Sequence, residues 1–408
     1  MKLKIKINWS FVFSILVFFV VSTQILFPLK INIYIANLFL YMLLSMYILY
    51  MLLTKKYKIY LNSFLICYFF FVLWSGFSLF WSVDINFTFP LLIRILFLFL
   101  TLFVMYNIFK NFNNEFYLLY GVIVAAYFNF FIALGIINYT TPFTNNLRFT
   151  GTLARSNDVA IVMIITLVSA FILLNEERIS KIWKKIALLS IPLSLYVIFL
   201  TVSKKGVIFG GLLTLLYFID EIKNNFKKFL SIFIISSISI FFLFKDNIDI
   251  IVEKFNRLLA RFSEFDSALN GYENFGSTAE RLRFIKEGIE YLSNHPFHGY
   301  GLNTFIVMDS SHHYSHNNYI EILVGTGIIG FILYYCIYLM MFVKLFSIKS
   351  KRYKKIRNIL LFSLIVFLFM DTALVSYSYK IIIFMLFFIF IYIEKLSEES
   401  KKVENEEN

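Results

Sequence analysis

The chain has 408 residues, of which 60% are hydrophobic and 15% are charged, and 52 of them are Phe. A soluble domain could not bury so much apolar surface, so the composition excludes that class and indicates a protein surrounded by lipid. The net charge of +13 does not indicate a nucleic-acid partner, because most Lys and Arg residues flank apolar segments. Cys67 and Cys336 lie inside such segments and offer neither a disulfide framework nor a metal-ligand spacing.

Long apolar segments predict an all-α fold, a polytopic bundle of about twelve transmembrane helices of roughly 20 residues each. The first is expected to be retained, because it is too long for a signal-peptide core and lacks a clear cleavage site. We expect one membrane domain over residues 1–396, with spans near 9–28, 31–53, 59–81, 88–108, 116–138, 158–175, 186–202, 205–219, 229–244, 317–343, 358–378 and 381–395.

The distribution of Lys and Arg predicts the orientation of these spans. Most of them fall in the loops on the side of the N-terminus, so both termini are expected to be cytoplasmic. The stretches 139–157 and 245–316 should then face outward. The tail 397–408 is acidic and polar, and we expect it to be disordered.

The long outer stretch 245–316 contains two predicted helices. The first is amphipathic and should lie on the outer membrane surface, with apolar residues at helical spacing and a stripe of Lys254, Arg257 and Arg261. The second opens at a capping box, Ser277 to Glu280, and ends at Pro296. It carries Arg281 and Arg283, and Gly288 would leave room for a ligand or another backbone.

Two short motifs in other outward turns are candidate anion sites. Arg148, followed by Asn157 at the start of a span, offers a bidentate guanidinium beside a helix N-terminus; the alternative is an interfacial Arg that snorkels. Lys204 and Lys205 are adjacent cations on the side that the positive-inside rule disfavours. They predict an anionic ligand or, equally, contact with lipid headgroups.

All five histidines fall between His295 and His316, in the only long hydrophilic stretch. His316 and Asn317 directly precede a span, and a helix N-terminus disfavours the imidazolium. His316 should therefore be neutral and able to accept a proton, or else it only caps its helix and packs. Gly299 and Gly301 would allow a substrate to approach the backbone closely. The spacing of His312, His313 and His316 would suit zinc, but no Cys is near, and we expect no metal site.

Three ionisable residues lie inside predicted spans: Arg94, Glu321 and Asp371. Charges within the membrane are costly and usually line a bundle interior or a cavity. A buried Arg94–Asp371 pair and a polar pocket opening outward are both compatible with the sequence.

The order of these motifs resembles the O-antigen ligase and O-antigen polymerase superfamily, over about residues 148–340. The resemblance rests on Arg148…Gly151…Asn157, on Thr201 to Gly206, on Arg281…His295-Pro296…Gly299-Tyr300-Gly301, and on His316-Asn317-Asn318-Tyr319-Ile320-Glu321…Gly327-Ile328-Ile329-Gly330. The chain departs from the family where Lys204 replaces an Arg and where Arg155-Ser156-Asn157 replaces Asn-Pro-Asn. A Lys lacks the fork of a guanidinium, so the role of that cation is in doubt.

The resemblance implies an integral membrane glycosyltransferase that uses a glycan on undecaprenyl pyrophosphate at the outer face of the inner membrane. It implies that Arg148, Arg281 and His316 are the catalytic residues. Arg148 and Arg281 would stabilise the leaving pyrophosphate, and His316 would deprotonate the acceptor in an inverting displacement. Further candidates for binding pyrophosphate or glycan are Lys204, Lys205, Arg283, Arg94, Asn317 and Glu321.

We therefore expect a polymerase of lipid-linked repeat units for O-antigen or capsule, without a cofactor, with a flippase and a chain-length regulator as further partners. A ligase that transfers the finished glycan to another acceptor would use the same donor. A transporter of lipid-linked sugars would explain the spans but not the histidines, and a metal-dependent hydrolase would use the histidines differently.

Overall fold

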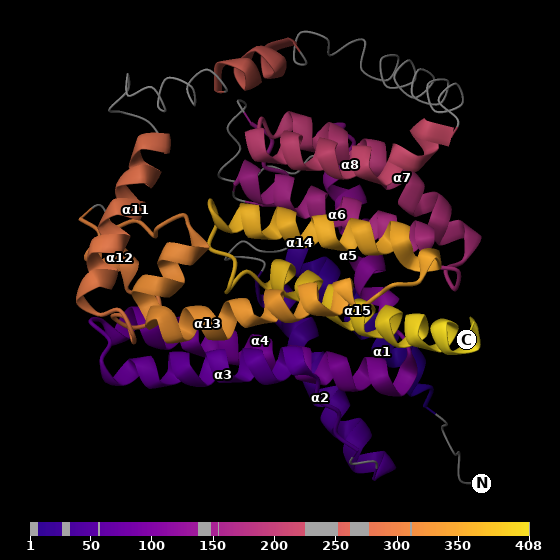
Figure 1. Cartoon of the computed structure of the whole chain (residues 1–408), viewed down its shortest axis with the longest axis horizontal. Coiled ribbons are helices and arrows are strands. Elements are labelled where there is room, and N and C mark those ends of the chain that lie inside the picture. The colour runs from indigo at the N-terminus through magenta and orange to yellow at the C-terminus, as the bar shows by residue number, and fades with distance from the viewer. Residues whose placement is uncertain are drawn as a thin grey trace.

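The structure is a computed structural model of the chain, and it describes residues 7–26, 33–55, 58–137, 148–153, 155–224, 252–261, 277–310 and 312–407. Within these residues all regular structure is helical (Figure 1). Eleven of the twelve predicted spans are found as helices, and the remaining one, 229–244, lies outside the described residues. The eleven are α1 (Trp9–Leu26), α2 (Ile33–Thr54), α3 (Ser63–Phe77), α4 (Ile85–Phe112), α5 (Phe116–Ala133), α6 (Ser156–Asn175), α7 (Lys181–Leu200), α8 (Lys204–Asn224), α13 (Asn318–Phe346), α14 (Lys354–Asp371) and α15 (Lys380–Glu407).

Among the residues that the structure describes, eight helices are long and apolar enough to cross a membrane, namely α1 to α7 and α13. The other three helices, α8, α14 and α15, carry charged residues closer to their apolar part than those eight do. Helix α14, for example, has Lys354, Lys355 and Arg357 in its first turn and ends at Asp371. The predicted class, an all-α polytopic membrane protein, is confirmed.

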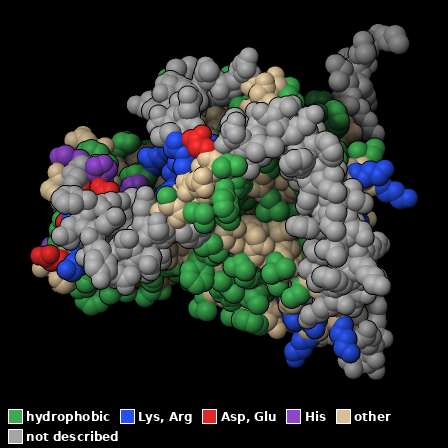
Figure 2. Space-filling view, turned by 90° about the horizontal axis from the view of Figure 1, so that it is seen from above, with side chains coloured by type: hydrophobic (Ala, Val, Ile, Leu, Met, Phe, Trp, Pro, Cys, Tyr) green, Lys and Arg blue, Asp and Glu red, His purple; other side chains and the backbone are tan. Residues whose placement is uncertain are grey.

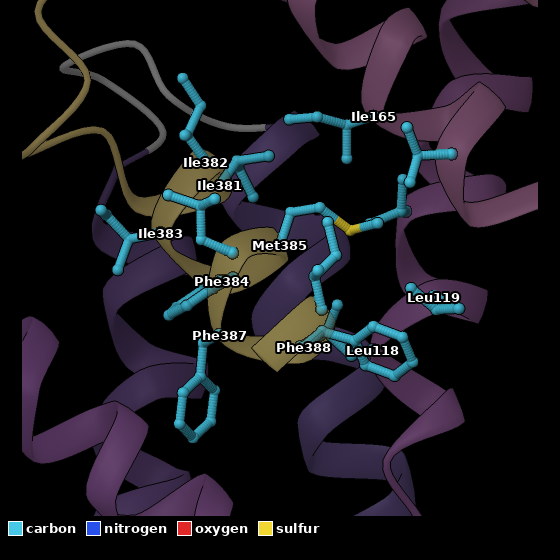
Figure 3. Close-up of a cluster of buried hydrophobic side chains, with 14 of the residues drawn as sticks. Leu118, Leu119, Ile165, Ile381, Ile382, Ile383, Phe384, Met385, Phe387 and Phe388 are labelled. Carbon is cyan, nitrogen blue, oxygen red and sulfur yellow. The ribbon is translucent and has the colours of Figure 1, made fainter. Parts of the chain in front are cut away.

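The last helix, α15, lies at the centre of the bundle. Its residues from Ile381 to Phe390 are at most 5% exposed on every side of the helix. Figure 3 shows several of them in one cluster with Leu118 and Leu119 of α5 and Ile165 of α6. Phe387 packs edge-on against Phe64, at 5.3 Å between ring centroids, and Phe388 packs against Phe116 at 5.9 Å. A helix that is apolar all round must be enclosed by protein or lipid, and here protein encloses it.

The tail after residue 396 is helical to Glu407, where we expected disorder. The helix is already nucleated by its buried part, so each further residue adds to it at low cost. Glu398 and Lys402 stand four residues apart in the favourable order. The tail is also anchored, because the backbone N–H of Ser350 donates to Ser400 Oγ at 3.3 Å.

Two helices of the long outer stretch, α11 (Ser277–Asn294) and α12 (Phe305–Met308), stand at the end of the molecule opposite the C-terminal end of α15 (Figure 1). Phe284 of α11 packs edge-on against Phe305, at 5.8 Å, and both contact the start of α13. A Cβ on Gly288 would meet Ile320 Cγ2 at 2.3 Å. The room that Gly288 leaves is therefore filled by α13 and not by a ligand.

Helix α13, predicted as one uninterrupted span, is broken at Gly327, which has φ 67° and ψ −171°. The loop after α11 pairs with the broken segment: Tyr300 N donates to Val324 O at 2.9 Å, and Ile328 N donates to Pro296 O at 2.8 Å. A Cβ on Gly299 would meet Val324 O at 2.4 Å. The close approach that we expected between the loop glycines and a substrate is thus made to other parts of the protein. Gly299 approaches α13, and Gly301 approaches Ser82, whose Cα would lie 2.8 Å from a Cβ.

Replacement of Gly327 by Ala should destabilise the protein. The backbone there favours glycine, and a Cβ would come within 2.2 Å of Phe297 O. We expect the free energy of unfolding to fall by at least ~1–3 kcal/mol, measured as thermal or denaturant unfolding in detergent. Gly211→Ala is the control, because a Cβ there meets nothing within 4 Å. Equal stability of the two variants would contradict the proposed importance of the break.

Candidate active site

A pocket of about 400 Å³ opens where the ends of several helices meet. Its walls come from the starts of α6 and α8, the end of α14, the helix 252–261, α11 and the segment before α13. The lining residues are Arg155, Asn157, Asp158, Ala160, Ile161, Ile164, Ser203, Lys204, Lys205, Gly206, Ile208, Arg261, Arg281, Tyr314, His316, Met370, Thr372, Ala373 and Leu374.

Charge is distributed unevenly in this lining. Five of its side chains are cationic, and one, Asp158, is a carboxylate. The cations are Arg155, Lys204, Lys205, Arg261 and Arg281. Such a site attracts a multiply charged anion, and guanidinium groups suit phosphate oxygens because they can donate two parallel hydrogen bonds. The structure therefore brings together Lys204, Lys205, Arg281 and His316, four of the residues that the sequence singled out.

Backbone carbonyls at the end of α7 hold two arginines of this region. Arg148 Nε donates to Thr201 O at 2.9 Å, and Arg261 donates to Val202 O at 2.8 Å. The last carbonyls of a helix carry partial negative charge, so they are natural partners for cations. Burial, and then repulsion by Arg261 and Arg281, lower the pKa of Arg148 to about 10.

Arg148 itself is not among the residues that line the pocket. Its second bond runs to Asn157 Oδ1, at 2.9 Å, so its guanidinium ties the turn after α7 to the start of α6. This arrangement suits a positioning role better than direct contact with a ligand.

Lys204 and Lys205 form the first turn of α8, where the sequence predicted only a tight turn. Ser203 Oγ accepts a bond from Gly206 N at 3.3 Å and so caps this helix. Lys204 Nζ donates to Arg261 O, and Lys205 Nζ lies 3.3 Å from Thr372 Oγ1 at the end of α14. The unpaired N–H groups of a helix start add to the positive potential that the two lysines create.

His316 adopts a left-handed backbone conformation, with φ 54°, directly before α13. Its ring lies 4.1 Å from that of Tyr314 and stacks on Phe284 at 6.2 Å. Burial, and then the charges of Arg281 and Arg155, lower the pKa of His316 to about 4. This environment favours the neutral imidazole that we expected, with burial as the largest cause.

Asn317 and Glu321, both predicted to bind substrate, instead shape the segment that carries His316. Asn317 Oδ1 caps α13 by accepting from Tyr319 N at 3.0 Å and Ile320 N at 3.3 Å. Glu321 is 2% exposed, and its carboxylate accepts from Ser315 N at 2.9 Å and Ser315 Oγ at 2.6 Å. Neither residue lines the pocket.

Arg283 and Arg94 also lie away from the pocket. Arg283 pairs with Glu287 at 2.7 Å and with buried Asp309 at 2.9 Å, and its bond to Glu287 is the main reason that its pKa is raised. Arg94 on α4 lies near three tyrosines, Tyr68, Tyr377 and Tyr379.

The Arg94–Asp371 pair that the sequence allowed is not formed. Asp371 instead accepts from Tyr335 Oη at 2.9 Å and from Asn318 Nδ2 at 3.3 Å. It thereby joins the end of α14 to the first part of α13.

The other histidines gather at the same end of the molecule, where Figure 2 shows them in purple. His298 Nδ1 lies 2.8 Å from Gly299 O, and its ring packs edge-on against Trp81. His295 packs against Tyr300 at 4.6 Å. These two shape the turn after α11. In the part of the chain that the structure describes, no three His, Cys, Asp or Glu side chains are grouped so that they could hold a metal ion.

Sequence reasoning missed three lining residues, Arg155, Asp158 and Tyr314. Arg155 donates a bond to Tyr314 Oη, and its guanidinium lies 5.2 Å from the centre of that ring. The available signal was the departure from the family's Asn-Pro-Asn at residues 155–157.

Arg261 was recognised only as part of a basic stripe on the membrane surface. Helix 252–261 turns buried Lys254 and Leu258 inward, and it exposes Val252, Phe255 and Leu259. Of its basic stripe, Arg261 lines the pocket, and Arg257 pairs with Glu253 at 2.7 Å.

Residues 187–335 match a family model described as O-Antigen ligase. The match includes Lys204, Lys205, Arg261, Arg281 and His316, and it ends inside α13. No curated protein matches the chain.

Binding of inorganic pyrophosphate should depend on Arg281 and not on Arg283. Loss of one charge-assisted bond in the pocket should weaken binding about 10- to 100-fold, so Arg281→Gln should show this loss in calorimetry at fixed ionic strength. Arg283→Gln removes the same charge two residues away, from a side chain already paired with Glu287 and Asp309, and should change the affinity less than about 3-fold. Similar losses in both variants would argue against the pocket as the anion site.

Proposed function

Since residues 187–335 place this protein in the O-antigen ligase and polymerase superfamily, we propose that it polymerises lipid-linked oligosaccharide repeat units at the membrane. The coarser activity, that of a membrane glycosyltransferase of this superfamily, follows from the family. The finer proposal is carried by one observation, a pocket whose lining combines five cations with His316, whose pKa is lowered by burial and by neighbouring charges.

The cations fit the leaving group of such a reaction. Transfer from a sugar–pyrophosphate lipid breaks the bond between the anomeric carbon and a phosphate oxygen, and the electron pair remains on the pyrophosphate. Arg281, Arg261 and Lys204 are fixed donors that would stabilise this developing charge, a term that is often the largest in catalysis. We propose that these side chains supply the charge without a bound metal ion.

His316 fits the role of general base. The acceptor hydroxyl would attack the anomeric carbon from the side opposite the pyrophosphate, which inverts the centre, and its proton would pass to the neutral imidazole. Burial, and then the charges of Arg281 and Arg155, keep the pKa of His316 low. A bound pyrophosphate would offset their charges and make the imidazole a stronger base when the donor is present.

The pocket also fits a lipid carrier such as undecaprenyl pyrophosphate. Below the cations its wall is apolar, with Ile161, Ile164, Ile208, Met370 and Leu374. This wall would accept the first units of the lipid chain while the glycan remains outside. We place the site on the outer face of the inner membrane, with both termini cytoplasmic, and we propose a flippase and a chain-length regulator as partners.

A ligase is the second candidate, favoured by the description of the matching family model. It would use the same donor and leaving group and would differ only in the acceptor. An assay offering either a second lipid-linked repeat or a lipid core as acceptor separates the two.

Purified protein should convert an undecaprenyl-pyrophosphate oligosaccharide into polymer, also in the presence of a strong chelator. His316→Ala should lower the rate at least ~10²-fold, because it removes the general base. His313→Ala is the control, since only its backbone N–H bonds to Asp309 and its ring does not line the pocket. Normal chain length from His316→Ala would refute the role of this histidine.

Activity should be retained in mildly acidic buffer. Because the pKa of His316 is lowered to about 4, the free enzyme holds a neutral base above that pH and loses it as the pH falls through that value. The acid limb of kcat/KM should therefore lie below the ordinary pKa of histidine, near 6.5. An acid limb at 6.5 would contradict the pocket environment described above.

A cysteine at position 293 should react with a membrane-impermeant maleimide applied to intact cells, and a cysteine at position 347 should not. Ser293 is exposed on α11, and Ser347 is exposed at the opposite end of α13. The two half-buried native cysteines, Cys67 and Cys336, set the background in the unmodified protein. The reverse labelling pattern would overturn the proposed orientation.

A further inference from the structure

Asp158 is the carboxylate among the residues that line the pocket, and the mechanism above gives it no task. It lies in the first turn of α6, three residues after Arg155. Across the described residues its carboxylate accepts no hydrogen bond and forms no ion pair within 4 Å. Arg155, the nearest cation along the chain, directs its guanidinium to Tyr314 Oη instead.

The environment of Asp158 restricts what its partner can be. A half-buried carboxylate without a hydrogen bond is costly. A pyrophosphate cannot satisfy it, because like charges repel and an ionised carboxylate only accepts hydrogen bonds. The partner must therefore be a group that donates a hydrogen bond, and the hydroxyls of a glycan are such donors.

The placement of Asp158 also fits a group that acts beside the pyrophosphate. The preceding residue, Asn157, is bound by Arg148, which in turn is held by the end of α7. The start of α6 is thereby fixed relative to Lys204 and Lys205 on α8. A pyrophosphate bound by these cations would bring the sugar attached to it close to Asp158, which belongs to the same lining.

We propose that Asp158 accepts a hydrogen bond from a sugar hydroxyl of the substrate and thereby selects and orients the glycan. This inference rests on the proposed function, because it requires a glycan in the pocket. The hydroxyl belongs either to the donor sugar next to the pyrophosphate or to the acceptor sugar that attacks it. Both present the same chemistry, and kinetics distinguish them.

The test compares Asp158→Asn with the unmodified full-length protein in two measurements on the same preparation in lipid nanodiscs. The first is binding of undecaprenyl pyrophosphate that carries no sugar. Removal of a negative charge beside five cations should leave this affinity unchanged or raise it, up to about 10-fold. The second is glycan transfer, whose kcat/KM should fall about 10- to 100-fold because a charged hydrogen bond to the substrate is lost.

Slower transfer without weaker binding of the sugar-free lipid distinguishes a contact with the glycan from a purely structural role of Asp158. If Asp158 only stabilised the start of α6, its loss would weaken the binding of the sugar-free lipid together with transfer, and this outcome would overturn the proposal. Unchanged transfer would overturn it too. A rise in KM confined to the donor assigns the contact to the donor sugar, and a rise confined to the acceptor assigns it to the acceptor hydroxyl.

Glu280→Gln is the matched control. Glu280 is an exposed carboxylate beside Arg281 and does not line the pocket. Its replacement removes the same charge from the region and should leave transfer unchanged; an equal loss of transfer would show that regional charge, and not contact, is responsible. Absence of product from the unmodified protein would instead refute the proposed function itself, and with it the role of Asp158.

Discussion

Mutual repulsion of the cations around one half-apolar pocket is the constraint on which the rest of this structure depends. Each of Arg155, Arg261 and Arg281 raises the electrostatic cost of placing the others, and the lipid surroundings screen little of it. The fold offsets this cost with backbone carbonyls and helix ends, and only a bound anion would balance it fully. Because this repulsion is balanced only in part by the protein itself, the pocket is suited to binding a multiply charged anion.

The two arginines that the end of α7 holds show how the fold meets this constraint. Thr201 and Val202 offer their carbonyls because the helix ends there, so backbone groups help to hold Arg148 and Arg261 in place. On the opposite wall, the break of α13 at Gly327 lets the loop after α11 pair with backbone, and α11 then carries Arg281 to the pocket.

The spans could be predicted from the sequence because a helix in lipid must be long and apolar, and a long apolar segment can be recognised directly in the sequence. Arg281, His316 and Lys204 could be found because they are polar where the chain is otherwise apolar. Asp158 could not, since its importance comes from the meeting of α6 with residues 314–316, which are far apart in the chain. Arg283 was predicted to bind the substrate because it lies near Arg281 in the sequence. It lies two residues further along α11, however, and therefore faces a different side of that helix.

The central position of α15 bears on how the protein is made. A ribosome delivers helices to the membrane in chain order, so the preceding spans are inserted before Ile381 to Phe390 arrive. Those spans must then surround a space whose walls, such as Phe64 and Phe116, face lipid until the last helix enters. Assembly of the core is thus delayed to the end of synthesis, and a chain that stops before α15 would expose the whole inner surface of the bundle to lipids and to quality-control proteases.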